Sequence, residues 1–305
     1  MSLKKNIRSF VLSHGVTREF FFFIMHKKAN KKKIDKKIAN SDFHFARQKI
    51  DAIVSLTSYG ERLKELQYTL YSLVSQSVRP EKIVVNLAEK DFISMPPILR
   101  IFEKYGVEYC ETEDFKSYKK LIPTLQKYPD KIIVTADDDL YYPQDWLEKL
   151  WKGHLEYPDC VICHLTKTIC FDKGKLIPYN ELKYNKEFIA PNYSNFILSG
   201  AGALFLPKNF YSDICNTEVF LKLCPFADDI WDYFMCILNK TKIMQLSHSY
   251  TNVCYVNPYR EYGITYGATL SDQNVTLNKN DTQFQAVMKH YGLSEISLEQ
   301  LLKEI

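Results

Sequence analysis

Short apolar runs alternate with segments of helical periodicity from Ile50 onward, and this alternation constrains the fold more than any other feature of the chain. The runs at residues 50–57, 81–88, 107–114 and 131–136 have the length and β-branched content of strands. Residues 61–77, 96–106 and 117–129 have helical spacing, the last interrupted near Pro123. Strands and helices in this order form a parallel sheet with helices on both faces. The sequence therefore predicts an α/β fold with a mixed, mainly parallel, Rossmann-like sheet flanked by helices.

The second half of the chain is less regular. A helix at residues 143–158 and a strand at 160–165 precede a tyrosine-rich stretch, residues 166–195, which we expect to be an irregular surface excursion. An apolar strand pair around Gly200 and Gly202 follows, then a helix at 228–241 with an acidic first turn and helices at 282–291 and 298–305. The simplest partition is a basic helical appendage at residues 1–49, one catalytic domain at 50–270, and a C-terminal helical extension at 271–305.

The net charge of +4 is unevenly distributed. Residues 1–49 contain 13 Lys or Arg and 3 Asp or Glu, whereas the rest of the chain carries a balance of −6. The lysines beside the apolar residues 20–25 fit a peripheral contact with an anionic membrane surface, and they equally fit a solvated basic helix that packs a few aromatic rings on the protein. Nucleic acid is not expected as a partner, because the acidic remainder repels phosphate and no recognition motif accompanies the lysines.

The apolar segments and the cysteines indicate in which cellular compartment the protein is expected. No stretch approaches the roughly 20 apolar residues of a membrane-spanning helix, and no small-residue cleavage site follows residues 20–25. The eight cysteines do not suggest a disulfide framework, which favours a cytoplasmic protein, at the inner face of the cell membrane if the basic segment binds lipid. The spacing Cys160-x-x-Cys163-His164 matches a haem attachment motif, but strand-like alternation would point the two cysteines to opposite faces, so haem is disfavoured.

Polar residues follow the predicted strands at their carboxyl ends. These are Thr57, Ser58 and Tyr59 after the first strand, Glu113 and Asp114 in the third, and Asp137, Asp138 and Asp139 after the fourth. Ligands of such sheets bind at the carboxyl ends of the strands. We call this predicted edge the rim and expect it to form the functional site.

Three adjacent aspartates repel one another, so a positive partner is expected beside them. A solvated acidic turn is the simplest interpretation of the triplet alone. The buried strand that leads into it, and a further acidic pair on the rim, favour a site for Mn²⁺ or Mg²⁺, since hard cations prefer oxygen ligands.

The stretch "ADDDLYYPQDW" after an apolar strand, preceded by "IVSLTSYGER" at the start of the alternation, resembles the GT-A fold of nucleotide-sugar-dependent glycosyltransferases. Within that fold the chain is most similar to family 2 and related bacterial enzymes, over about residues 49–241. The resemblance implies a nucleoside-diphosphate sugar as donor, with a UDP-sugar favoured, and a saccharide or lipid-linked acceptor. It also implies a role in surface polysaccharide or lipopolysaccharide synthesis.

The resemblance implies a set of donor-binding residues. In it Asp137 faces the nucleoside and Asp139 binds the metal, with Asp137 as a further metal ligand, and Asp138 serves either role. The other residues implied for the nucleotide are Thr57, Ser58 and Tyr59 at the nucleobase, Arg62 at a phosphate or the base, Asp114, and Lys119 or Lys120. The two lysines equally fit an ordinary helix surface.

The stretch "FADDIWDYF" resembles the family's acidic pair at the start of a helix, where one carboxylate deprotonates the acceptor. Asp229 is the first choice for this base and Asp228 the second, because Asp228 also suits an N-cap. Gly200, Gly202 and Trp231 are candidates to line the donor sugar or acceptor, although glycines there also fit a bulge or turn. His248 is a candidate metal ligand, and a structural histidine is its simpler interpretation.

The resemblance implies a metal-dependent, inverting transfer, in which the metal neutralises the departing diphosphate and Asp229 or Asp228 takes the acceptor proton. The tyrosine-rich stretch 166–195 could form part of the acceptor platform. Two alternatives remain open. One is another metal-dependent nucleotide enzyme such as a nucleotidyltransferase, which would need a glycine-rich phosphate loop near the first strand, where "TSYGERL" has one glycine. The other is an inactive fold-mate that binds a glycan or a protein partner.

Overall fold

The computed structural model describes residues 29–247, 253–257 and 279–303. His248, the boundary at residue 270 and most of the basic segment 1–49 lie outside these residues, so the predicted metal ligation and domain limits stay predictions.

Helices and strands alternate through the first half, as the sequence predicted. The α-helices are α3 (Lys31–Ala39), α4 (Leu66–Val74), α5 (Glu89–Ile93), α6 (Ile122–Lys127), α7 (Trp146–Glu156), α8 (Thr217–Leu223), α9 (Asp228–Leu238), α11 (Lys279–His290) and α12 (Glu295–Leu302). The strands are β1 (Ala52–Thr57), β2 (Lys82–Ala88), β3 (Val107–Thr112), β4 (Ile132–Thr135), β5 (Leu140–Tyr141), β6 (Val161–Cys163), β7 (Thr166–Thr168), β8 (Phe171–Asp172), β9 (Lys175–Leu176), β10 (Ile189–Asn192), β11 (Asn195–Ile197), β12 (Ala203–Phe205), β13 (Ile243–Gln245) and β14 (Cys254–Tyr255). Short 3₁₀ helices are η1 (Gly60–Lys64), η2 (Pro97–Tyr105), η3 (Lys116–Lys120), η4 (Tyr179–Glu181), η5 (Ser199–Ala201), η6 (Pro207–Asn209) and η7 (Ser212–Cys215).

The central sheet has eight strands in the order β10-β13-β6-β12-β4-β1-β2-β3. The pairs β4-β1, β1-β2, β2-β3 and β13-β6 are parallel. β12 runs antiparallel to both of its neighbours, with Ala203 opposite Thr135 of β4 and Cys163 of β6. The predicted fold class, a mixed and mainly parallel sheet flanked by helices, is confirmed.

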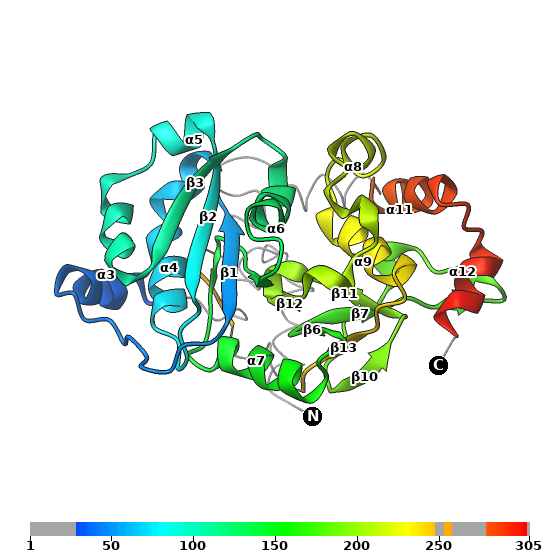
Figure 1. Cartoon of the computed structure of the whole chain (residues 1–305), viewed down its shortest axis with the longest axis horizontal. Coiled ribbons are helices and arrows are strands. Elements are labelled where there is room, and N and C mark those ends of the chain that lie inside the picture. Colours follow the sequence, from blue (N-terminus) through cyan, green and yellow to red (C-terminus); the bar gives the residue numbers. More distant parts are fainter. Residues whose placement is uncertain (1–28, 248–252, 258–278, 304–305) are drawn as a thin grey trace, which may run out of the picture.

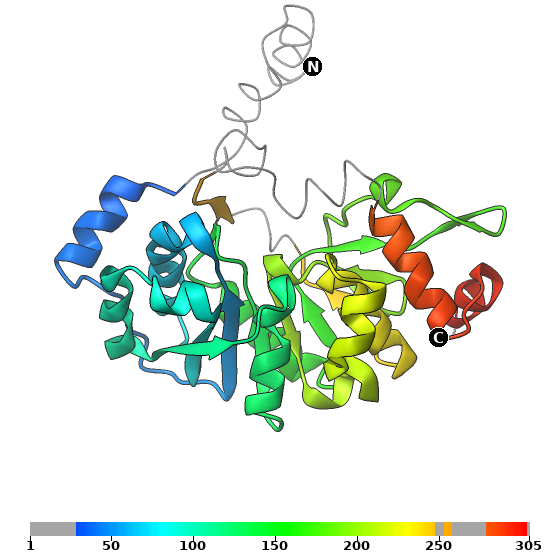
Figure 2. The same cartoon turned by 90° about the horizontal axis from the view of Figure 1, so that it is seen from above.

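Alternate residues of the strands enter two separate hydrophobic clusters, one on each face of the sheet. Val134 of β4 belongs to the cluster that includes residues of α3, α4 and α7, whereas its neighbour Ile133 belongs to the cluster that includes residues of α6, α9, α11 and α12. Figure 1 shows β1, β2 and β3 beside α4 on the left and α9, α11 and α12 on the right. Seen from above in Figure 2, α3 (blue) and α12 (red) again lie at opposite ends of the molecule.

The terminal helices belong to these clusters. Ile34 and Ile38 of α3 are buried against the first cluster, and Phe284 and Leu298 of α11 and α12 lie in the second. Within residues 29–247, 253–257 and 279–303, no helix combines the length and apolar character needed to cross a membrane.

Several local predictions need correction. Residues 97–105 form a 3₁₀ helix, closed as expected by Gly106 at a positive φ of 86°. The stretch 166–195 contains four short strands and the start of a fifth, so it is more ordered than an irregular excursion. β11 and β12 do not pair with each other, because β11 pairs with β7 and β12 joins the central sheet. The turn η5 between them carries the chain from one sheet to the other.

Candidate functional site

The aspartate triplet follows β4 at the carboxyl end of the parallel strands, where the sequence placed it. Asp138 is buried, and its Oδ2 accepts a 2.5 Å hydrogen bond from Ser58 Oγ after β1. Burial raises the pKa of Asp138 to about 6, a shift that Arg62 opposes and Asp139 reinforces. Ser58 and Asp138 therefore join the ends of two adjacent strands, as the predicted rim requires.

Arg62 supplies positive charge to two of the aspartates. Its Nη2 lies 2.9 Å from Asp138 Oδ1 and also donates to Asp139 Oδ2. The guanidinium carbon lies 5.4 Å from the centre of the Tyr59 ring, and 41% of Tyr59 is exposed. Burial disfavours the charge on Arg62, but the two carboxylates outweigh it and hold its pKa well above the ordinary value.

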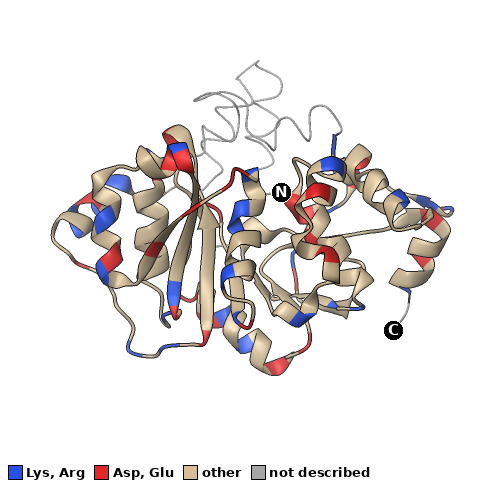
Figure 3. Ribbon diagram, turned by 45° about the horizontal axis from the view of Figure 1, so that its top comes forward, with Lys and Arg blue, Asp and Glu red and all other residues tan. Residues whose placement is uncertain are grey.

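Lys120 connects the triplet to the second acidic motif. Its Nζ lies 3.0 Å from Asp137 Oδ1 and 3.0 Å from Asp228 Oδ2, and its side chain is only 7% exposed. Burial disfavours the ammonium, and the charges of Asp137 and Asp228 more than compensate, so the pKa of Lys120 is raised. Acidic and basic segments occur together around the middle of the molecule (Figure 3). One buried lysine thus contacts carboxylates of two motifs that are far apart in the sequence.

Asp229 is held by Ser199 of η5. Its Oδ1 accepts a hydrogen bond from Ser199 N at 3.0 Å and a second from the Ser199 hydroxyl. Burial and the charge of Asp228 raise the pKa of Asp229 to about 6, against the opposing effects of Lys120 and Ser199. A carboxyl with such a pKa exchanges a proton readily near neutral pH.

A third carboxyl, Asp232, lies one turn further along α9 and was not predicted. Both of its oxygens are buried without a hydrogen-bond partner, and burial together with Asp228 and Asp229 raises its pKa. These three carboxyls form an acidic group at the start of α9, and Lys120 forms an ion pair with one of them, Asp228.

The two glycines make room for protein side chains. A Cβ at Gly200 would lie 1.8 Å from Asp137 Oδ2, and a Cβ at Gly202, where φ is +118°, would lie 2.5 Å from Nε1 of Trp146. In the sequence analysis, either close approach of a ligand or a turn of the backbone explained these glycines. The structure shows a turn packed against Asp137 and an indole.

Tyr142, Trp146 and Ser199 lie at the candidate site, and the sequence analysis did not predict them there. Tyr142 OH accepts from Asp137 N at 2.8 Å and donates to Gly200 O at 2.7 Å, and Trp146 Nε1 donates to Ala201 O at 2.8 Å. Both aromatic residues fix η5 beside the triplet. The signals in the sequence were the position of Ser199 directly before Gly200, and the position of Tyr142 and Trp146 within the stretch "ADDDLYYPQDW".

Other residues predicted to bind the nucleotide contact neighbouring protein groups. Thr57 Oγ1 donates to Asn86 O at 2.7 Å, and Lys119 pairs with Asp114, whose side chain is 51% exposed. The prediction of an N-cap at Asp228 is wrong, because Ala227 is the N-cap and makes no side-chain hydrogen bond. Asp228 lies inside the first turn and pairs with Lys120 instead.

Trp231 also differs from its predicted setting. Its indole is fully buried between Phe220 and Tyr291, and Nε1 donates to Ile214 O at 3.0 Å. A contact with a sugar would require this packing to open.

The acidic residues as arranged do not fit the predicted metal. Asp137 is bound to Lys120, Asp139 is bound to Arg62, and Asp138 has one oxygen on Ser58 and the other on Arg62. Across the part of the chain that the structure describes, no group of three Asp, Glu, His or Cys side chains is arranged to hold a metal ion. A divalent cation at Asp139 requires that Arg62 move, and Mn²⁺ or Mg²⁺ stays a prediction.

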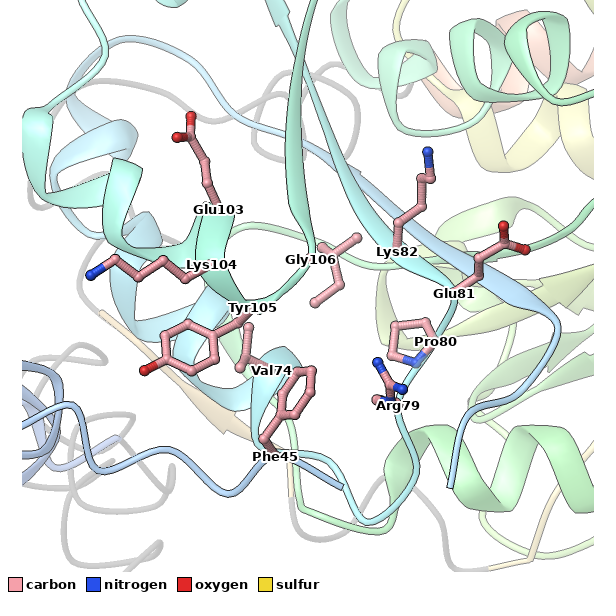
Figure 4. Close-up of a pocket in the computed structure, with 11 residues that line it drawn as sticks. Phe45, Val74, Arg79, Pro80, Glu81, Lys82, Glu103, Lys104, Tyr105 and Gly106 are labelled. Carbon is pink, nitrogen blue, oxygen red and sulfur yellow. The ribbon is translucent and has the colours of Figure 1, made fainter. Parts of the chain in front are cut away.

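A pocket of about 340 Å³ lies at the opposite edge of the sheet (Figure 4). It is lined by Phe45, Arg79, Lys82 and Tyr105 among others, where β2 begins. Lys82 is bound to Glu108 at 2.9 Å, and Arg79 lies over the Phe45 ring at 5.0 Å. None of the predicted site residues lines this pocket, so we locate the candidate site at the rim.

Comparisons with known proteins gave similarities of fold only. No family model matches the chain, and no curated protein matches it. Residues 1–349 of S. aureus TarS in complex with UDP align with 14% identity and a TM-score of 0.43, over 80% of this chain and 73% of that one. A CMP:2-keto-3-deoxy-manno-octonic acid synthetase complexed with CTP aligns with 10% identity and a TM-score of 0.39, over 66% of this chain and 89% of that one. At these values neither protein assigns a substrate or an activity to this chain.

Proposed function

We propose that the chain is a glycosyltransferase that moves a sugar from a nucleoside-diphosphate sugar, with a UDP-sugar favoured, to a hydroxyl of a saccharide or lipid-linked acceptor. The observation that carries the proposal is the placement of Asp229. Its carboxyl is fixed by Ser199 at the turn that packs against Asp137, and Lys120 joins Asp137 to Asp228 beside it. A base and a nucleotide-binding rim are thus held in one network.

In the proposed reaction Asp229 is the base. Both hydrogen bonds from Ser199 end on Oδ1, so we assign Oδ2 to receive the proton of the acceptor hydroxyl. The acceptor oxygen then forms a bond to the anomeric carbon while the bond from that carbon to the diphosphate oxygen breaks on the opposite side. The electron pair leaves with the nucleoside diphosphate, and the configuration at the anomeric carbon inverts. A positioned base contributes about 10²- to 10⁴-fold to such a step.

Asp228 has a different role in this proposal. Its carboxylate is the buried partner of Lys120, and its charge raises the pKa of Asp229. The geometry therefore favours Asp229 over Asp228 as the base. The proposed setting, synthesis of bacterial surface polysaccharide or lipopolysaccharide, rests on the sequence resemblance alone.

Release of UDP from a panel of UDP-sugars with mixed saccharide acceptors tests the function. We expect Asp229→Asn to lower transfer by about 10²- to 10⁴-fold and to leave the thermal shift with UDP unchanged, because its carboxyl acts on the acceptor. Asp145→Asn is the matched control, since Asp145 forms an ordinary surface pair with Lys149 at 2.8 Å.

Two results would contradict the proposal. Transfer that persists in Asp229→Asn would remove Asp229 as the base. Release of pyrophosphate from a nucleoside triphosphate, in place of nucleoside diphosphate from a sugar nucleotide, would favour the nucleotidyltransferase alternative.

A further inference from the structure

Lys167 of β7 is a buried cation that forms no ion pair within the part of the chain that the structure describes. The residue is 5% exposed, and its Nζ donates to the carbonyl oxygen of Tyr179 at 3.4 Å. Lysines are rarely buried unless a carboxylate pairs with them, because burial disfavours the charge. Burial lowers the pKa of Lys167 to about 8, against the opposing charges of Asp229 and Asp281. The described residues thus leave this ammonium group without a contacting anion.

Two tyrosine rings lie over the ammonium group of Lys167. Its Nζ is 3.9 Å from the centre of the Tyr179 ring and 5.0 Å from that of Tyr184. Tyr179 is fixed, because its backbone N donates to Asp281 Oδ1 at 2.7 Å and its ring packs edge-on against Phe196 at 5.5 Å. Tyr184 is 58% exposed, so one of the two rings faces solvent. Ring faces attract a cation, but they carry no full negative charge to neutralise it.

This lysine lies near the proposed base. Lys167 is opposite Phe196 of β11, so the two side chains share one face, and Phe196 packs on α9. β11 leads into η5, where Ser199 holds Asp229. Burial raises the pKa of Tyr179, and the charge of Asp229 raises it further. Lys167 and Tyr179 are therefore both close enough to Asp229 to respond to its charge.

The aspartate triplet and Lys167 lie on different sides of β12. The triplet follows β4, whereas β7 follows β6, and β12 separates β4 from β6 in the sheet. Figure 1 shows β7 and β11 across β12 from β1. In the proposed function the nucleotide occupies the rim beside the triplet. The side of Asp229 that carries Lys167 is then left for the acceptor.

We propose that Lys167, with the rings of Tyr179 and Tyr184, binds an acidic group of the acceptor, which is therefore an anionic saccharide. The carboxylate of a uronic acid or a phosphate ester on a sugar supplies this charge. Either group would form a charge-assisted hydrogen bond with the buried ammonium group. The same molecule can then present a hydroxyl to Asp229. That the ligand is an acceptor rests on the proposed function, whereas the binding of an anion rests on Lys167 and its neighbours.

Transfer to matched acidic and neutral acceptors tests the role of Lys167. The pairs are methyl glucuronide with methyl glucoside, and glucose 6-phosphate with glucose. We expect Lys167→Gln to raise KM for the acidic acceptor by about tenfold, because a hydrogen bond between charged groups is lost, and to leave kcat nearly unchanged. Lys167→Arg, which keeps the charge, should largely retain the low KM. Lys152→Gln is the control, since the Lys152 side chain is 70% exposed and pairs with Glu148 at 2.6 Å.

A second measurement uses the unaltered chain and requires no transfer. Limiting acetic anhydride at about pH 8 acetylates amines in their neutral form, so the lowered pKa favours labelling of Lys167, which mass spectrometry quantifies. Methyl glucuronide or glucose 6-phosphate should slow this labelling severalfold, because a bound anion favours the charged amine. Methyl glucoside should have no effect, and labelling of Lys152 should not change. This measurement decides the question if Lys167→Gln fails to fold.

The outcomes separate this inference from the proposed function. Protection by methyl glucuronide alone would assign a carboxylate to the ligand, and protection by glucose 6-phosphate alone would assign a phosphate. Lys167 that neither acid protects, or that is not labelled at any pH, would overturn the inference, as would an unchanged KM in Lys167→Gln. Transfer to neutral acceptors would leave the proposed function standing in that case. Protection of Lys167 in a chain that transfers no sugar would reject the function and leave the anion site.

Discussion

Replacing Lys120 by methionine should reveal how strongly the two acidic motifs depend on one ammonium group. The change keeps an unbranched side chain of similar length and removes the charge that lies 3.0 Å from both Asp137 and Asp228. It leaves two carboxylates that were neutralised by the same partner. The consequence differs between them, because their side chains are 41% and 12% exposed, respectively.

The expected magnitude follows from this difference in burial. Removing one partner of a buried ion pair typically costs about 3–5 kcal/mol, since the remaining charge is left without compensation. Asp137 is well solvated and adds little, because exposed ion pairs contribute about 0–1 kcal/mol. We therefore expect Lys120→Met to lower the free energy of unfolding by about 3 kcal/mol, nearly all of it from Asp228. A domain with a typical stability of about 5–15 kcal/mol remains folded after this loss.

Urea denaturation followed by circular dichroism measures the effect. Lys119→Met is a matched control from the next position, because Lys119 is equally buried but its partner Asp114 is 51% exposed. The control should lose no more than about 1 kcal/mol. Asp228→Asn introduced with Lys120→Met should restore about 2 kcal/mol, since the uncompensated buried charge is then absent.

Equal losses in the Lys120 and Lys119 variants would refute this reasoning. So would strict additivity of the Lys120 and Asp228 changes. Either result would mean that Lys120 does not neutralise Asp228 in solution.

Three further outcomes are expected. The transfer rate should rise with pH through about 6, because Asp229 accepts a proton only when it is ionised and its pKa is raised to about 6. Asp228→Asn removes a charge that raises this pKa, so the midpoint of the pH–rate profile should move to lower pH. A midpoint that moves to higher pH would contradict the assignment of Asp229 as the base. Gly202→Ala should lower the free energy of unfolding by about 3 kcal/mol, because the added methyl group would meet the Trp146 indole and the φ of Gly202 is +118°. Gly174→Ala is the control, since Gly174 has a φ of +78° but open space around it, and it should lose about 1 kcal/mol in the same urea assay. Removal of residues 1–28, which retains α3, should weaken co-sedimentation with anionic phosphatidylglycerol vesicles and leave co-sedimentation with neutral phosphatidylcholine vesicles unchanged. Equal binding of the full and the shortened chain to phosphatidylglycerol vesicles would argue against a membrane contact.

The first half of the sheet could be predicted from local patterns, because β1, β2, β3 and β4 are apolar runs separated by helical periodicity. The direction of β12 could not. A short apolar strand buried on both faces has the same pattern whichever way it runs, and only its neighbours decide. The prediction of a strand pair around the glycines failed for the same reason.

The candidate site was predictable in its acidic residues other than Asp232, but not in their partners. The sequence called for positive charge beside the triplet, and the resemblance assigned it to a metal. In the structure Arg62 and Lys120 provide that charge. Lys120 meets Asp228 only through the tertiary fold, which is why local capping rules gave Asp228 the wrong role.

The reversed direction of β12 has a consequence for the order in which the protein assembles during synthesis. Its pairing with β4 sets Ala203 opposite Thr135, and this register delivers Ser199 to the edge where the triplet emerges. A nascent chain that ends after α7 already contains Arg62, Asp138 and Asp139, but it lacks the serine and the carboxyl at the start of α9. Contacts between segments so distant in the chain form late and slowly. The residues of the acidic rim can therefore be synthesised before Ser199 and Asp229, and the candidate site is assembled only when β12 pairs with β4.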